Sequence, residues 1–136
     1  MKINAIAIMF KKERLNKNFL DEFRDYDFSK IEETKIFLVG SIRFRDYFIK
    51  IESILQIIYN KLVGICSVDG LLNKDKFNTE EWDKLQEIAI RKLSDQEAIL
   101  VLDVKNYVGE QSNEEIEYFK STLHKPVYYL SRLKVN

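Results

Sequence analysis

Two polar segments of the sequence carry residue types that can bind an anion or act on a sugar. The first is Gly40-Ser41-Ile42-Arg43, which follows an apolar run and precedes an amphipathic stretch. Between a buried strand and a helix N-terminus, their backbone N–H groups, the Ser41 hydroxyl and the Arg43 guanidinium can together hold a phosphate. The same residues also fit a tight strand-to-helix turn in which Ser41 caps the helix and Arg43 is solvated. The residues alone leave both interpretations open.

The second segment centres on Glu115. Ser112 and Glu115 have the spacing of a capping box, in which the serine accepts from the N3 backbone N–H and the glutamate returns to the N-cap N–H. The spacing by itself favours this structural role. A carboxylate in the first turn of a helix is also kept ionised by the helix dipole, and at the carboxyl edge of a sheet it can act as a nucleophile.

Strand-like and helix-like segments alternate along the chain, and they must position both motifs. Residues 35–39 and 99–104 are short, nearly unbroken apolar runs, which are typical of strands buried on both faces. Further strands are predicted at 4–9, 62–68 and 127–130. The alternation favours right-handed crossovers and a mostly parallel open sheet of about five strands. We therefore expect a three-layer α/β fold of the flavodoxin or Rossmann type, with helices on both faces of the sheet.

Helices are predicted where apolar side chains recur every three or four residues. Two of these helices cover 44–62 and 112–123, and a third begins after the N-cap Asn78. A fourth, short helix lies in the amino-terminal segment and has apolar residues at 15, 19 and 23. Trp82 falls on the apolar face of the helix after Asn78, so we expect it in the core. Ligands of open parallel sheets bind outside the carboxyl ends of the strands. That rule selects the loops at 40–43, 69–78 and 105–115.

Length and charge restrict the classes of protein. A chain of 136 residues has the length of a single domain. Within it, residues 1–34 are predicted to form a strand and a helix that pack on a core at 35–130. The chain carries 22 basic and 22 acidic residues, so its zero formal charge argues against a nucleic-acid polymer as partner. One cysteine cannot form an internal disulfide, which points to a reducing, cytoplasmic setting. The apolar run at 3–10 is too short to span a membrane.

Three stretches together resemble one family. They are 35–44 (KIFLVGSIRF), 99–119 (ILVLDVKNYVGEQSNEEIEYF) and 125–130 (KPVYYL). In this order and separation they are similar to the nucleoside 2-deoxyribosyltransferase-like superfamily, over about residues 35–130. That superfamily includes transferases and deoxynucleoside-monophosphate N-glycosidases, so the resemblance implies a hydrolase or a transferase acting on a nucleoside or nucleotide.

The resemblance also implies roles for individual residues. The Gly40–Arg43 turn would contact the phosphate or sugar of the ligand, and Gly109 and Ser112 would assist that binding. Glu115 takes the place of the catalytic glutamate, which attacks the sugar C1′ or stabilises the positive charge that develops there as the base departs. No cofactor or metal is implied. Members of the family are commonly homodimers, so a homodimer is expected here as well.

Two positions depart from the family pattern. Phe37 stands where members with demonstrated chemistry carry a tyrosine, and Ala89 stands where they carry an acidic residue. Acidic residues close enough in sequence to substitute for the latter are Asp83, Glu87, Asp95 and Asp103. These departures favour an alternative function, a sensor or interaction module that binds a nucleotide without turning it over. A third interpretation makes the domain a scaffold whose Ser112 and Glu115 only cap a helix.

Overall fold

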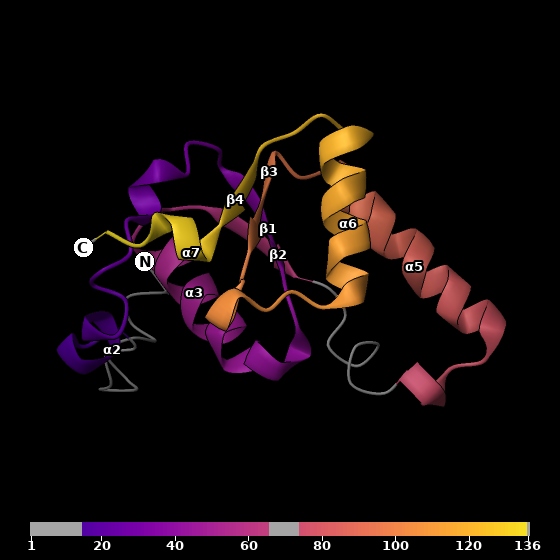
Figure 1. Cartoon of the computed structure of the whole chain (residues 1–136), viewed down its shortest axis with the longest axis horizontal. Coiled ribbons are helices and arrows are strands. Elements are labelled where there is room, and N and C mark those ends of the chain that lie inside the picture. The colour runs from indigo at the N-terminus through magenta and orange to yellow at the C-terminus, as the bar shows by residue number, and fades with distance from the viewer. Residues whose placement is uncertain (1–14, 66–73, 136) are drawn as a thin grey trace, which may run out of the picture.

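A parallel β-sheet forms the centre of the chain. The computed structural model describes residues 15–65 and 74–135, and Figure 1 shows the sheet between its helices. The described strands are β1 (Lys35–Val39), β2 (Leu62–Ile65), β3 (Ala98–Val101) and β4 (Val127–Tyr129), in the order β2-β1-β3-β4 with every pairing parallel. The expected parallel α/β fold is therefore confirmed, with four strands in the described part. The predicted strand at 4–9 lies outside the described residues.

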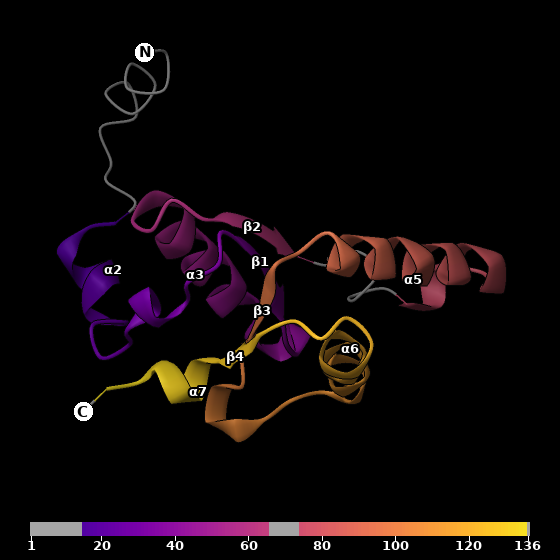
Figure 2. The same cartoon turned by 90° about the horizontal axis from the view of Figure 1, so that it is seen from above.

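The apolar runs of β1 and β3 are buried on both faces, as their composition predicts. In the pairing of β1 with β3, Ile36 lies beside Ala98 and Phe37 beside Ile99, so alternate residues line opposite faces. Helix α3 (Arg45–Ile57) packs on the face of Ile36, and α6 (Glu110–Ser121) packs on the face of Phe37. Figure 2 shows the sheet enclosed between these two helices. The result is a three-layer arrangement with one apolar cluster on each side.

The amino-terminal segment adds to the cluster under α3. Helix α2 (Lys17–Asp21) begins after the N-cap Asn16 and is followed by a 3₁₀ helix at Phe28–Lys30. Phe23 and Phe28 are buried in the α3 cluster. The prediction that one helix runs through residue 23 is wrong, because the helix ends at Asp21. Phe23 lies in the turn that follows the helix, and its side chain is buried in the cluster from there.

Helix α3 is shorter than the predicted 44–62. It ends at Ile57, and Asn60 adopts a left-handed backbone with φ 58° before β2 begins. Ile58 and Leu62, expected on the apolar face, are instead 48% and 60% exposed. The spacing of three and four persists beyond the real helix end because β2 begins with apolar residues of its own.

Helix α5 (Thr79–Ser94) has the predicted start but an unexpected environment. Asn78 accepts a hydrogen bond from Glu81 N, and the Glu81 side chain accepts one from Asn78 N, so the cap is a complete capping box. Leu93 is the buried residue of this helix. Figures 1 and 2 show α5 projecting away from the sheet beyond α6. Trp82, expected in the core, is only half-buried on this projecting helix.

Two predicted strands end earlier than expected. The run at 99–104 leaves the sheet after Val101, because residues Val104–Asn106 form a 3₁₀ helix. The run at 127–130 ends at Tyr129, and α7 (Leu130–Leu133) follows directly. Leu130 and Leu133 are buried, so their apolar character serves a helix that the sequence pattern did not reveal. No described helix is long and apolar enough to cross a membrane.

Candidate functional site

The sheet order places the loops after β1 and β3 side by side. The chain passes from β1 to β2 on one side and then returns to β3 on the other, so strand order reverses between β1 and β3. The two strands are still joined at their carboxyl ends, where Leu102 N donates to Val39 O at 2.7 Å. The crevice outside such a switch point is where open α/β sheets bind ligands. Residues 40–43 and 103–107 follow β1 and β3 at this switch point.

The first of these loops is a tight, capped turn. Ser41 Oγ accepts a hydrogen bond from Arg43 N at 3.2 Å, at the start of the 3₁₀ helix Ile42–Phe44. The prediction that Ser41 caps this turn is therefore confirmed. A Cβ at Gly40 would stand 3.2 Å from both Cβ and O of Leu102, so Gly40 is needed for the close approach of the two loops. Ser41 uses an acceptor lone pair here, which leaves its O–H able to donate to an anion.

Arg43 contacts the second loop. Its guanidinium carbon lies 4.3 Å from the ring centroid of Tyr107, and the ring of Phe44 meets Tyr107 edge-on at 6.2 Å. Arg43 is exposed and Tyr107 is 37% exposed, so the pair faces solvent beside the switch point. A guanidinium stacked on an aromatic face keeps its in-plane N–H donors, which suit a phosphate. The sequence motif contained Arg43, but the only sequence signal for Tyr107 was an aromatic residue in a polar loop.

A strained turn precedes Tyr107. Lys105 and Asn106 both adopt left-handed conformations, with φ of 56° and 60°. Asparagine tolerates this region and lysine does so at a greater cost. The turn is closed by Asn106 N donating to Asp103 O and Tyr107 N donating to Val104 O, both at 3.0 Å. Strained backbone of this kind persists where the surrounding structure fixes it, and here it lies at the switch point.

Asp103 is a buried carboxylate at the same edge of the sheet, and it is engaged. Only 8% of the residue is exposed, and it accepts hydrogen bonds from Ser131 N at 2.9 Å and Ser131 Oγ at 2.6 Å. Asp103 therefore caps α7, although it lies 28 residues earlier in the sequence than Ser131. It does not fill the family's acidic position as a free carboxylate. Burial, followed by the charges of Tyr47 and Asp103, raises the pKa of the neighbouring Tyr26.

Helix α6 begins earlier than predicted, which changes the interpretation of Glu115. Its N-cap is Gly109 with no side-chain cap, so the predicted capping box of Ser112 and Glu115 is wrong. Ser112 is buried inside the first turn (7% exposed), and Glu115 is partly buried further along. At a rise of about 1.5 Å per residue, Glu115 lies roughly 7.5 Å from the first helical residue, beyond the turn where the helix dipole acts strongly. Gly109 has φ −68° and an open Cβ position, so neither backbone nor space demands glycine there.

The two departures from the family pattern lie in different environments. Phe37 is fully buried in the cluster under α6. Ala89 lies on the projecting α5, as do Asp83 and Glu87, and Glu87 accepts from Arg91 at 2.7 Å and Lys84 at 3.4 Å. The structure therefore brings neither a tyrosine hydroxyl nor a free acidic group from these positions to the crevice.

A separate open cleft lies at the opposite end of the sheet. Its volume is about 300 Å³, and its lining residues are Lys35, Gln56, Leu62, Val63, Gly64, Asp95 and Gln96. These residues start β1, form β2, connect α5 to β3 and, in the case of Gln56, belong to the last turn of α3. None of the predicted site residues lines it, and Asp95 faces this cleft instead of the carboxyl edge.

The described part of the chain has no cluster of three or more histidine, cysteine or acidic side chains that could hold a metal ion. Comparison with protein-family models, with curated proteins and with solved structures finds no match for this chain. The geometry of the switch point is thus the structural basis on which a function can be argued.

Proposed function

We propose that the crevice between the carboxyl ends of β1 and β3 binds a nucleoside 5′-monophosphate or a nucleoside. The observation that carries this proposal is Arg43 stacked on Tyr107 across the switch point, 4.3 Å from the ring centroid. The Arg43 guanidinium and the Ser41 hydroxyl supply donors for the phosphate, and Tyr107 supplies an apolar face beside it. Because the chain has zero formal charge, these local donors and not the overall field must hold the anion.

The chemistry that we propose at this crevice is cleavage or transfer at the N-glycosidic bond, with Glu115 as the acting carboxylate. Departure of the base gives the sugar C1′ oxocarbenium character, which a carboxylate stabilises electrostatically or captures as a covalent glycosyl intermediate. In transfer, a second base attacks C1′ and regenerates the free carboxylate; in hydrolysis, water does so. The support is the resemblance of residues 35–130 together with the partly buried position of Glu115 on α6, which starts from the loop bordering the crevice.

Binding without turnover is the second candidate, and specific observations favour it. Phe37 is fully buried and offers no hydroxyl, and Asp103 is held by two hydrogen bonds from Ser131. Ala89 lies on α5, which projects from the body. A nucleotide could then be held by Ser41 and Arg43 without the helpers that glycosidic cleavage requires.

A panel of nucleosides, deoxynucleosides and their 5′-monophosphates tests both candidates. Thermal unfolding measures binding, and chromatography of the free base measures cleavage. Stabilisation with base release that disappears in Glu115→Gln supports the enzyme. Stabilisation without release from any compound supports the binding module, and release that persists in Glu115→Gln removes Glu115 from the mechanism. If no compound stabilises the chain and none releases free base, the proposed function is overturned.

A matched pair of arginine variants tests the position of the site. Arg43→Ala is expected to abolish the stabilisation by monophosphates. Arg132→Ala is the control, because Arg132 makes the same kind of contact, 4.4 Å from the ring centroid of Tyr129, but on α7 after the edge strand β4 and not in the loops that follow β1 and β3. Equal losses in both variants would show a diffuse charge effect and would contradict a site at Arg43.

A further inference from the structure

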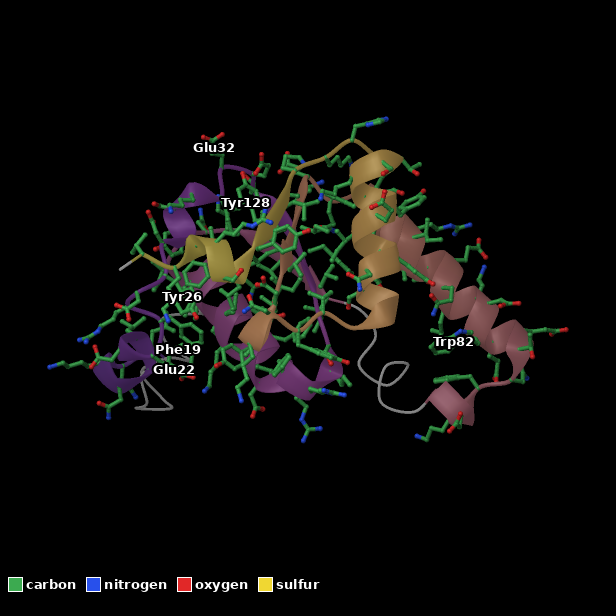
Figure 3. All side chains as sticks on the ribbon, viewed as in Figure 1. Phe19, Glu22, Tyr26, Glu32, Trp82 and Tyr128 are labelled. Carbon is green, nitrogen blue, oxygen red and sulfur yellow. The ribbon has the colours of Figure 1, made fainter. Side chains whose placement is uncertain are left out.

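The open cleft at the end of the sheet opposite the switch point results from the arrangement of the helices, and we call it the amino-end cleft. On the Phe37 face, α6 packs against β1, β3 and β4. Figure 3 shows Trp82 on the outer half of α5, far from the sheet, so α5 borders the cleft only where the helix ends. Gly64 lies beside Phe37 and adds no side chain to this face of β2. A cleft of about 300 Å³ therefore remains there.

Hydrogen bonds hold the walls of the amino-end cleft in place. Lys125 Nζ donates to Ser94 O and Gln96 O, both at 2.7 Å, which fixes the connection between α5 and β3. The Glu97 carboxylate accepts from two backbone N–H groups at the start of β1. Leu62 N donates to the chain before β1 at 2.8 Å, which fixes the start of β2. A site whose walls are held in this way is preorganised for a ligand.

The polar side chains that line the cleft are not used by these bonds. Four of them make no side-chain hydrogen bond or ion pair with another described residue: Lys35, Gln56, Asp95 and Gln96. The lining thus offers one ammonium, one carboxylate and two amides, each of which can still bind a ligand. Leu62, which is 60% exposed, adds apolar surface beside them.

The position of Asp95 is not explained by the stability of its helix. Asp95 is the C-cap residue of α5, at the negative end of the helix dipole, where a carboxylate is disfavoured. A cation bound at this place would meet both the carboxylate and the favourable end of the dipole. The surroundings of Asp95 therefore suit the ammonium group of a ligand.

We propose that the amino-end cleft binds a small zwitterion, an amino acid with an apolar side chain. Its ammonium meets Asp95, its carboxylate meets the Lys35 ammonium, and its side chain covers Leu62. The amides of Gln56 and Gln96 supply further donors and acceptors. A nucleotide phosphate does not suit this cleft, because Asp95 would repel it. The proposal does not rest on the switch point, so it stands or falls separately from the proposed function.

A nuclear magnetic resonance titration of the whole chain tests the proposal. The probes are alanine, valine, leucine, isoleucine, methionine and phenylalanine, each added alone. At least one of them is expected to shift the backbone amide signals of Gly64 and Gln96 in a saturable way. A nucleoside 5′-monophosphate is expected to leave these two signals unchanged. If no amino acid of the panel shifts them, the proposal is overturned.

Derivatives of the tightest probe test which group of the ligand meets which residue. N-acetylation removes the ammonium and a carboxamide removes the carboxylate, so each should weaken binding to the parent chain about tenfold. Asp95→Asn should weaken binding of the free amino acid about tenfold and should no longer distinguish it from the N-acetyl form. Lys35→Met should likewise lose the distinction from the carboxamide. A derivative that binds the parent chain as tightly as the free amino acid overturns the proposal and points to a peptide terminus.

Two controls separate binding from stability and from net charge. Asp95→Asn should not lower the midpoint of urea denaturation, because it removes a charge that the helix dipole disfavours. Lys17→Met and Asp21→Asn remove the same charges at exposed positions on α2, and they should bind the probe as the parent chain does. Equal losses of affinity in these variants and in the cleft variants would contradict a site at Lys35 and Asp95.

Discussion

The contact between Asp103 and Ser131 offers a test of how the carboxyl edge of the sheet is held together. Asp103 is nearly buried and accepts two hydrogen bonds, from Ser131 N at 2.9 Å and from Ser131 Oγ at 2.6 Å. Hydrogen bonds to a charged group contribute about 1.5–3 kcal/mol each. Ser131 is exposed, so water can replace the lost acceptor on its side. We therefore expect Asp103→Ala to lower the free energy of unfolding by about 2–4 kcal/mol.

A double-mutant cycle separates the two bonds. Ser131→Ala removes the hydroxyl bond but keeps the backbone N–H bond, so it should lower the free energy of unfolding by about 1.5–3 kcal/mol. In the double variant Asp103→Ala with Ser131→Ala, the loss of unfolding free energy should be smaller than the sum of the two single losses. The shortfall should be about 1 kcal/mol, because the two residues are in direct contact.

The appropriate assay is urea denaturation monitored by circular dichroism. Tryptophan fluorescence would report on α5, whereas the perturbation is at α7, which this carboxylate caps. A loss below about 0.5 kcal/mol in Asp103→Ala, the range of ordinary surface substitutions, would refute the reasoning. Fully additive losses in the double variant would show that the two side chains act independently.

Three further changes test the packing and the titration of the fold. Gly40→Ala should lower the free energy of unfolding by about 1–3 kcal/mol in urea denaturation, because its Cβ would stand 3.2 Å from Leu102; a neutral result would show that the loops can separate. Hydrogen bonds from two backbone N–H groups at the start of β1 lower the pKa of Glu97, so its stabilisation is present above the ordinary value of 4.5 and is lost as pH falls through the lower folded value. Glu97→Gln should thus flatten the acid side of the stability curve, and an unchanged acid slope would contradict this. Burial and a hydrogen bond to Glu33 raise the pKa of Tyr128, so its contribution is complete below the ordinary value of 10.0 and is lost as pH rises through the folded value. Tyr128→Phe should therefore reduce the alkaline fall in melting temperature, which thermal scans at increasing pH would measure against the parent chain.

Much of the secondary structure could be predicted because its signals are local. The apolar run at 35–39 became β1 without change, and the N-cap Asn78 marked the start of α5. The alternation of strands and helices indicated a parallel sheet, and the rule for such sheets selected the loop at 40–43. Each of these signals lies within a few residues of the feature that it predicts.

Predictions failed where a local pattern had two solutions. Ser112 and Glu115 have capping-box spacing, but the helix begins at Glu110, after the N-cap Gly109, because nothing in the spacing prevents an earlier start. The periodic apolar residues of 44–62 cover both a helix and the strand that follows it. Trp82 lies on an apolar helix face, yet only Leu93, near the end of that face, is buried in the core.

The sequence by itself determined most of the described strands and helices, the parallel fold class and the turn at Gly40–Arg43. Only the tertiary structure decided that Arg43 stacks on Tyr107 and that Asp103 is held by Ser131, a residue 28 positions further along. It also decided that α5 leaves the body of the domain. The physical reason is that hydrophobic periodicity acts over a few residues, whereas strand order brings together side chains from distant parts of the chain. Burial and hydrogen bonding between those side chains then decide which polar groups remain available for a ligand.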